Sequence, residues 1–247
     1  NIRTLARARW YDGLSINRVQ DNYVVQWGDP DGEDAAKAKK LPTGLRVIPA
    51  AKYVSDNIDI QLAAFKEERT KENEESWREA INAAPPAPPP TKKANPDIIA
   101  TQTASAALGW HQRDSYSIFV QFHEGWPLGN EGEDADGIFW PVHCYGMVGV
   151  GRGMPPDTGS GAELYTVIGH APRHLDRNIA LVGRVVEGIE HLSSLPRGTE
   201  ALGFYKTAAE RVPIVSIRLA SDLPAAEQPR FQYLSTQSQT FAAYAEA

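Results

Sequence analysis

Arg18 and Gln26 are the two residues whose types and spacing most clearly suggest a shared site. They lie in segments 11–19 and 23–30, which both have the pattern of a short β-strand between turn residues. An antiparallel hairpin brings residues of its two strands onto one face of a sheet, so the guanidinium and the amide are expected to be neighbours. The spacing alone leaves open the alternative of a solvated Arg18 and a surface Gln26.

A second candidate for chemistry is the glycine-rich segment 143–153, which has glycines at positions 146, 149, 151 and 153. Glycine permits close backbone approach and unusual dihedral angles. The segment lacks the Gly-Lys-Ser/Thr ending of a phosphate-binding loop, and no acidic residue follows at the spacing of a dinucleotide-binding motif. It therefore does not indicate phosphate binding.

The histidines and Ser160 form no convincing catalytic pattern. His170 and His174 have the four-residue spacing of two metal ligands on a helix, but Pro172 lies between them and no third ligand is evident. Ser160 fits the nucleophile elbow of hydrolases only loosely, because the glycine after it comes one position early. We expect no metal site, no cofactor and no hydrolase activity.

The composition is that of an ordinary globular protein, with 42% hydrophobic and 23% charged residues in 247. The net charge of −6 and the dispersed basic residues argue against a nucleic-acid-binding surface. No apolar run is long enough to span a membrane. Cys144 is the single cysteine, which excludes an internal disulfide.

The elements that position these residues suggest one domain over 1–223, followed by a C-terminal tail at 224–247. Residues from about 31–115 depart from the strand-like pattern and are interpreted as an insertion into this domain. The insertion contains a predicted helix at 59–82, whose middle is highly charged. A proline-rich segment follows at 84–96, which is typical of a polyproline II spacer or a loop.

Four sequence blocks, in order, resemble the cyclophilin-type peptidyl-prolyl isomerases. The family patterns Phe-His-Arg-Val and Phe-Met/Val-Ile-Gln-Gly-Gly-Asp correspond to INRV at 16–19 and YVVQWGD at 23–29. The patterns Gly-Ser-Gln-Phe-Phe-Ile and Leu-Asp-Gly-Lys-His-Val-Val-Phe-Gly-Lys-Val correspond to GAELYT at 161–166 and LDRNIALVGRV at 175–185. Together these blocks make the chain similar to a divergent bacterial member of the family.

The resemblance implies a mainly β fold, a closed eight-stranded antiparallel barrel capped by two helices. Residues 1–11 match the first capping helix, and residues from 186 to about 195 match the second. The first strands of the family's barrel would lie upstream of Asn1. Closing a sheet into a barrel removes its exposed edges, which is the physical advantage of this architecture.

The resemblance also implies catalysis of rotation about X–Pro bonds in protein folding, with Arg18 and Gln26 at the catalytic positions. A guanidinium can donate to the prolyl nitrogen as it pyramidalises, which favours the twisted state over the planar ones. Gln26 sits where the family holds the substrate backbone. The alternative is a proline-peptide binding module or scaffold that has little or no isomerase activity.

The family's substrate-binding positions correspond here to Tyr23, Val24, Gly151, Arg152, Gly153, Glu163, Tyr165, His174 and Leu175. Several of these residues depart from the family pattern. Tyr23 and Tyr165 replace phenylalanines, and His174 aligns near a common tryptophan. Arg152 and Glu163 replace a neutral Asn and Gln, and they either pair with each other or bias peptide binding by charge.

The partners that this resemblance implies are proline-containing peptides or unfolded client proteins, and neither nucleic acid nor a membrane. The chain is expected to be a monomer. Export to a periplasm is the expected location, with the cytoplasm as the alternative, and the single cysteine does not decide between them.

Overall fold

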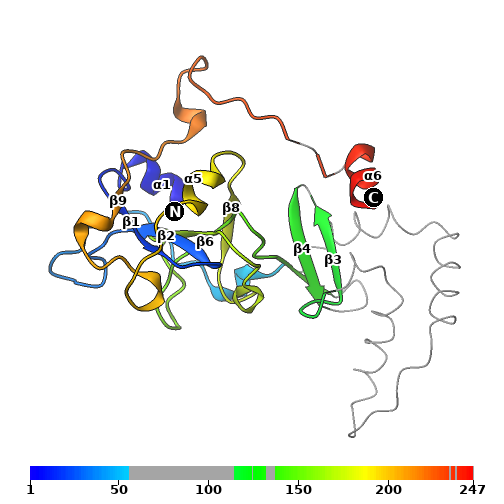
Figure 1. The fold of residues 1–247 in the computed structure, drawn as a ribbon, viewed down its shortest axis with the longest axis horizontal. Coiled ribbons are helices and arrows are strands. Elements are labelled where there is room, and N and C mark those ends of the chain that lie inside the picture. Colours follow the sequence, from blue (N-terminus) through cyan, green and yellow to red (C-terminus); the bar gives the residue numbers. More distant parts are fainter. Residues whose placement is uncertain (56–113, 124, 132–136, 234, 237, 247) are drawn as a thin grey trace, which may run out of the picture. The chain divides into compact units, whose positions relative to one another are not determined.

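The computed structural model describes residues 1–55, 114–123, 125–131, 137–233, 235–236 and 238–246 (Figure 1). The chain divides into two compact units, the first comprising Asn1–Tyr53 and His143–Tyr233 and the second Val54–Val142 and Leu234–Ala247. The predicted helix at 59–82 and the proline-rich segment at 84–96 lie outside the described residues. Both stay predictions, as do the boundaries of the predicted domain and of its insertion.

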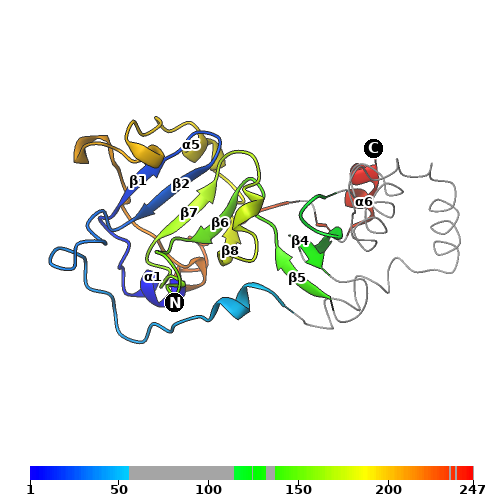
Figure 2. The same ribbon diagram turned by 90° about the horizontal axis from the view of Figure 1, so that it is seen from below.

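The first unit contains an antiparallel sheet of six strands, in the order β8-β6-β7-β2-β1-β9 (Figure 2). The strands are β1 (Ser15–Val19), β2 (Val24–Gly28), β6 (Met147–Val150), β7 (Leu164–Val167), β8 (Leu181–Arg184) and β9 (Val212–Pro213). All four residues of β7 are buried, and its side chains Leu164 and Tyr165 belong to two different core clusters. The sheet thus places β1 and β2 side by side and sets β2 against the buried β7.

The fold is mainly β with few helices, as predicted, but the closed eight-stranded barrel is not confirmed. Within the described residues the sheet ends at β8 on one edge and at β9 on the other, and these strands pair with β6 and β1 respectively. β9 is only two residues long, and its Pro213 has no N–H to donate to a neighbour. Among the described residues, backbone pairing at this edge continues only to Ile214, which donates to the Leu14 carbonyl at 2.7 Å and accepts from the Gly13 N–H at 2.9 Å.

Two short helices, α1 (Ile2–Arg7) and α5 (Ile189–Ser193), lie at opposite ends of this sheet (Figure 2). They fall within the two segments that were predicted as capping helices. Leu5 of α1 is fully buried in a cluster that includes Leu164 at the start of β7. Leu192 of α5 packs against a separate cluster near the other end of the strands. The cluster at α1 includes the end of β6 and the start of β7, and the cluster at α5 includes residues of β1 and β2 and Ile168 just after β7.

The chain after α1 turns inward and anchors the loop before β7. Arg9 has a left-handed backbone conformation, with φ of 52°, which is incompatible with continuing the helix. Tyr11 is fully buried, and its hydroxyl donates to the Gly161 carbonyl at 2.6 Å. This bond ties the start of the chain to the segment that leads into the candidate site.

Five short 3₁₀ helices complete the first unit within the described residues. They are η1 (Ala50–Tyr53), η3 (Arg173–Leu175), η4 (Ala201–Gly203), η5 (Ala208–Glu210) and η6 (Ala220–Asp222). Two of them border the site: η3 carries His174 and Leu175, and η4 lies against β1 through a bridge between Arg18 and Phe204.

The second unit contains a three-stranded antiparallel sheet and one helix among its described residues. The elements are β3 (Phe119–His123), β4 (Trp126–Glu131), β5 (Ile138–Pro141) and α6 (Gln239–Glu246), with strand order β3-β4-β5. Trp140 is 1% exposed and packs over Gly129, where a Cβ would lie 3.1 Å from the indole ring. In the described parts of both units, no helix has the length and apolar character needed to cross a membrane.

Candidate functional site

The hairpin of β1 and β2 brings the two central site residues together. Arg18 is the register partner of Gln26, and the register shifts between Ile16 and Arg18, which marks a β-bulge just before Arg18. Nη1 of Arg18 donates to Oε1 of Gln26 at 3.0 Å. The prediction that these two side chains are neighbours is therefore confirmed.

The Arg18 guanidinium is held from three directions and flanked by two aromatic rings. Its Nε donates to the Leu202 carbonyl at 2.6 Å, and its Nη2 donates to Oε1 of Gln20. Its Cζ lies 5.5 Å from the ring centre of Tyr23 and 5.6 Å from that of Phe204. The hydrogen bonds fix the plane of the guanidinium group, and the two aromatic rings attract its positive charge.

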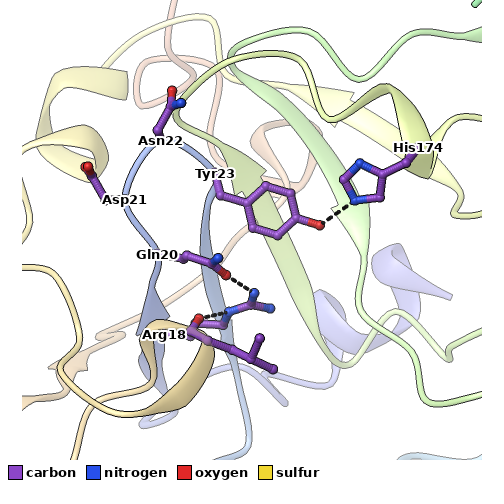
Figure 3. A pocket seen from close by; sticks show the side chains of 7 residues that line it. Arg18, Gln20, Asp21, Asn22, Tyr23 and His174 are labelled. Atoms are coloured by element: carbon purple, nitrogen blue, oxygen red, sulfur yellow. Dashed lines mark hydrogen bonds between the residues drawn. The ribbon is translucent and has the colours of Figure 1, made fainter.

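A pocket of about 500 Å³ opens beside this guanidinium (Figure 3). The pocket is lined by Arg18, Gln20, Asp21, Asn22, Tyr23, His174 and Leu202. In Figure 3 the side chains of Tyr23 and His174 point toward each other, and the Tyr23 hydroxyl lies 3.2 Å from Nε2 of His174. Their rings also stack, with centres 5.9 Å apart and an interplanar angle of 14°. One wall is thus aromatic and the other is cationic.

Sequence reasoning missed four residues of this lining: Gln20, Asp21, Asn22 and Leu202. The first three form the turn between β1 and β2, so the predicted hairpin was itself the signal that they lie beside Arg18. Leu202 comes from η4, far along the chain, and no local pattern links it to β1. Only the tertiary structure reveals that its carbonyl orients Arg18.

Burial governs the ionisation of the pocket residues. Partial burial lowers the pKa of Arg18 from its ordinary value, against the opposing effects of Tyr23 and Glu163. Arginine nevertheless stays charged at physiological pH. Partial burial raises the pKa of Tyr23, although the Arg18 charge opposes this. The pocket therefore pairs a permanent cation with a neutral phenol.

Gln26 connects Arg18 to an acidic residue behind it. The Gln26 amide faces the carboxyl group of Glu163, which precedes β7: Nε2 of Gln26 and Oε2 of Glu163 lie 3.5 and 3.1 Å from the position that a Cβ on Gly151 would occupy. Burial of the Glu163 carboxyl raises its pKa, and the Gln26 amide works in the opposite direction. The three polar side chains, Arg18, Gln26 and the partly buried Glu163, thus lie next to one another.

Of the predicted aromatic and apolar pocket residues, Tyr23 and His174 line the pocket, whereas Val24, Tyr165 and Leu175 are buried and do not line it. Val24, Tyr165, Val167 and Leu175 form one buried cluster, and Tyr23 packs against it. Tyr165 lies opposite Gly149 on β6, where a Cβ would come within 2.3 Å of the Tyr165 hydroxyl oxygen. Glycine is therefore required at this position for the Tyr165 ring to occupy its place.

A buried polar network holds Tyr165 from behind. The Tyr165 hydroxyl lies 2.8 Å from Nε2 of His143, and Nδ1 of His143 lies 2.8 Å from Oδ1 of Asp176. Arg173 donates from Nε to the second carboxylate oxygen at 2.6 Å. An ionised carboxylate only accepts, so Nδ1 of His143 is the donor in its bond to Asp176.

The glycine-rich segment 143–153 contributes to the site less directly than the hairpin of β1 and β2. Arg152 is directed to Asn178, donating to its backbone carbonyl at 3.1 Å and to its side-chain oxygen. The Gly153 N–H donates to Asp157, and the Gly151 N–H donates to the Glu163 carbonyl at 2.8 Å. These described contacts include no ion pair between Arg152 and Glu163, so that interpretation of the two charges is wrong.

Replacement of Leu202 by glycine is expected to change the free energy of unfolding by less than about 1 kcal/mol. Leu202 has φ of 58° and is 65% exposed, so the left-handed strain that glycine relieves offsets the chain entropy that it adds. Thermal and chemical unfolding of wild type and Leu202→Gly measure this change in free energy. A loss above about 2 kcal/mol would mean that the leucine side chain itself holds η4 against β1.

Comparison with known proteins gives a consistent result. The family model described as cyclophilin type peptidyl-prolyl cis-trans isomerase/CLD matches residues 1–219. The crystal structure of cyclophilin AquaCyp293 from Hirschia baltica is similar in fold, with a TM-score of 0.57 and 19% sequence identity, over 99% of this chain and 73% of that one. No protein of curated function matches the sequence. Because the family model spans most of the sequence, the chain belongs to the cyclophilin-type peptidyl-prolyl cis-trans isomerase family.

Proposed function

We propose that this protein catalyses the cis–trans isomerisation of X–Pro bonds at the pocket beside Arg18. Membership of the cyclophilin-type family supports the reaction. The observation that supports the site is the Arg18 guanidinium, which is fixed at the mouth of a pocket with an aromatic wall. Its substrates are proline-containing peptides and unfolded proteins.

The reaction requires stabilisation of a twisted amide. The barrier to rotation is about 18–20 kcal/mol, because resonance gives the C–N bond partial double-bond character. A donor aimed at the prolyl nitrogen stabilises its lone pair as that nitrogen pyramidalises, and this interaction is stronger in the twisted state than in either planar one. Rotation forms and breaks no covalent bond, so a positioned donor and an apolar slot meet the chemical need.

Arg18 retains the donors that this role needs. A guanidinium has five N–H groups, and among the described residues Nε, Nη1 and Nη2 each use one, on Leu202, Gln26 and Gln20. One N–H on each terminal nitrogen is left for a ligand. Because the guanidinium is already fixed, little side-chain freedom is lost when substrate binds.

Gln26 and the apolar cluster supply the remaining functions. The Gln26 oxygen is occupied by Arg18, and its amide nitrogen has two N–H groups, of which one can face Glu163 and the other a substrate carbonyl. Tyr23, which packs against the buried cluster of Val24, Tyr165 and Leu175, lines the pocket and provides a surface against which a proline ring can pack. The backbone and the ring of the substrate are thus held on either side of the rotating bond.

The second candidate function is a proline-peptide binding module with little or no isomerase activity. The observation that favours it is the carboxyl group of Glu163, whose electrostatic interaction with Arg18 opposes the positive field at the prolyl nitrogen. Such a site would still hold a proline in its apolar slot. The two candidate functions therefore differ in the rate of isomerisation and not in the peptide that is bound.

A protease-coupled assay on an X–Pro peptide, combined with calorimetric titration of an uncleavable analogue, separates the two functions. We expect catalysis that is proportional to enzyme concentration and inhibited by the analogue. Binding without catalysis would support the binding module. Absence of both would contradict the proposed site.

We further propose that the chain works as an exported, periplasmic monomer, on a completed eight-stranded barrel. Similarity to divergent bacterial members of the family is what supports this location and architecture, and a cytoplasmic location is the alternative. Fractionation of cells that express the native gene tests the location, and light scattering tests the oligomeric state.

A further inference from the structure

Glu163 lies in a slot formed by two glycines. A Cβ on Gly28 would lie 2.6 Å from Cγ of Glu163, and a Cβ on Gly151 would lie 2.9 Å from its Cβ. Both distances are shorter than ordinary van der Waals contact. Because neither glycine has a side chain, the stem of Glu163 can pass between β2 and the segment after β6.

The carboxylate at the end of this stem meets the Gln26 amide. The position of a Cβ on Gly151 is 3.1 Å from Oε2 of Glu163 and 3.5 Å from Nε2 of Gln26, so both polar groups converge there. The amide acts on the carboxyl as a donor does, because it lowers the Glu163 pKa. A carboxylate can only accept, so Nε2 of Gln26 must be the donor.

This polarity determines which end of the amide faces Arg18. With Nε2 turned to Glu163, the oxygen Oε1 faces Arg18 and accepts from Nη1 at 3.0 Å. A neutral amide at position 163 could instead donate to Gln26, which would allow the opposite orientation and direct an N–H at the guanidinium. The negative charge on Glu163 excludes this reversed orientation of the Gln26 amide.

We propose that Glu163 is a positioning residue for the isomerase reaction: its carboxylate orients the Gln26 amide, and the amide in turn orients Arg18. This inference rests on the proposed function. It assigns the acidic residue a role inside the site, in contrast to the expectation that its charge selects among peptides.

Protonation of Glu163 should change the orientation of the Gln26 amide. The charged groups that act on Glu163 are Arg18 on β1 and, from the loop after β2, Asp29 and Glu33. Burial makes the largest contribution and raises the Glu163 pKa, while the Gln26 amide opposes it. A protonated Glu163 becomes a donor, so the orientation of Gln26 is lost as the pH falls through this raised pKa.

The first test compares pH profiles of kcat/KM for wild type, Glu163→Gln and the exposed-residue control Glu190→Gln. We expect wild type and the control to lose activity as the pH falls, at a higher pH than an exposed glutamate titrates. Glu163→Gln should lack this limb and have a kcat about 3–10-fold lower at neutral pH, with KM little changed. Unchanged activity and an unchanged profile in Glu163→Gln would overturn the proposal.

The second test does not need catalysis. The side-chain amide resonances of Gln26, assigned by ¹⁵N NMR and identified with Gln26→Leu, should shift with pH in wild type and stay constant in Glu163→Gln. A Gln26 amide that does not sense Glu163 would overturn the proposal, whether or not the enzyme is active. An inactive wild type whose Gln26 amide does titrate would contradict the proposed function only.

Stability distinguishes positioning from structural support. A raised folded-state pKa means that protonated Glu163 contributes stability below its unfolded-state pKa, and this contribution is lost as the pH rises through the folded-state pKa. Glu163→Gln should therefore unfold at a higher denaturant concentration than wild type at neutral pH, and the advantage should vanish at acidic pH. A variant that is less active but more stable fits a positioning role, and one that is less stable at neutral pH contradicts it.

Gly151→Ala provides a variant that keeps the charge of Glu163. The new Cβ must displace the Glu163 stem, because the two Cβ positions would be 2.9 Å apart. We expect the Gln26 amide to lose its pH-dependent shift and kcat to fall as it does in Glu163→Gln. Retention of both would show that the slot does not determine the orientation of Gln26.

Discussion

Arg18→Ala is expected to lower kcat/KM for an X–Pro peptide by at least about 100-fold, which is the usual cost of removing one transition-state donor. Alanine removes the N–H groups that remain for the prolyl nitrogen, and it also leaves the Gln26 oxygen without its partner. The apolar cluster of Val24, Tyr165 and Leu175 is untouched. Peptide affinity should therefore fall much less than the rate, which paired activity and calorimetry measurements will show.

Arg18→Lys is the matched variant, because it keeps the charge and loses the planar fork. A single ammonium cannot donate to Leu202, Gln26 and Gln20 in the directions that the guanidinium satisfies, so we expect it to recover little of the activity. Both variants must first be shown to unfold cooperatively. Wild-type rates in a folded Arg18→Ala protein would remove this residue from the mechanism.

The local parts of this site were predictable from the sequence because a hairpin obeys simple geometry. Turn residues between two short strands place residues such as Arg18 and Gln26 across from each other, and the bulge beside Arg18 alters the register by one residue without separating them. The pocket wall followed from the resemblance, since it depends on which residue types occupy the matched blocks. Neither inference required distant contacts.

The rest of the site depends on contacts between segments that are far apart in the sequence. Leu202 and Phe204 reach Arg18 because η4 lies against β1, and nothing in the sequence near either residue signals this. The direction of Glu163 likewise depends on the absence of side chains at two glycines in other segments. The closed barrel was inferred from the family, and the order of the strands in the observed sheet depends on pairing between segments that are far apart, such as β1 and β9.

His143 illustrates a role that sequence reasoning missed. Beside Cys144 it has the pattern of a strand residue, yet it lies outside the strands and is completely buried. Its two ring nitrogens face Asp176 and Tyr165, so it links a carboxylate to the buried cluster against which Tyr23 packs. The signal is the replacement of the family's phenylalanine by Tyr165, because a buried phenol needs a hydrogen-bonding partner.

Asp176→Ala should lower the free energy of unfolding by about 3–5 kcal/mol, the usual cost of leaving the partner of a buried ion pair unpaired. The Asp176 side chain is 4% exposed and accepts from Arg173, whose side chain is 13% exposed. It also accepts from the backbone N–H and Nδ1 of His143. Chemical denaturation measures the loss, and a change below about 1 kcal/mol would show that the network contributes little to stability.

The pH dependence of this loss has a definite sign. Burial opposes ionisation of Asp176, but hydrogen bonds from His143 and Arg173 outweigh burial and hold the pKa of its carboxyl below the ordinary value. A depressed folded-state pKa contributes stability that is present above the unfolded-state pKa of about 3.9 and is lost as the pH falls through the folded-state value. The difference between wild type and Asp176→Ala should therefore be constant near neutral pH and shrink below about pH 4. A difference that is independent of pH across this range would mean that lost packing, and not the charge of Asp176, is what the alanine variant reports.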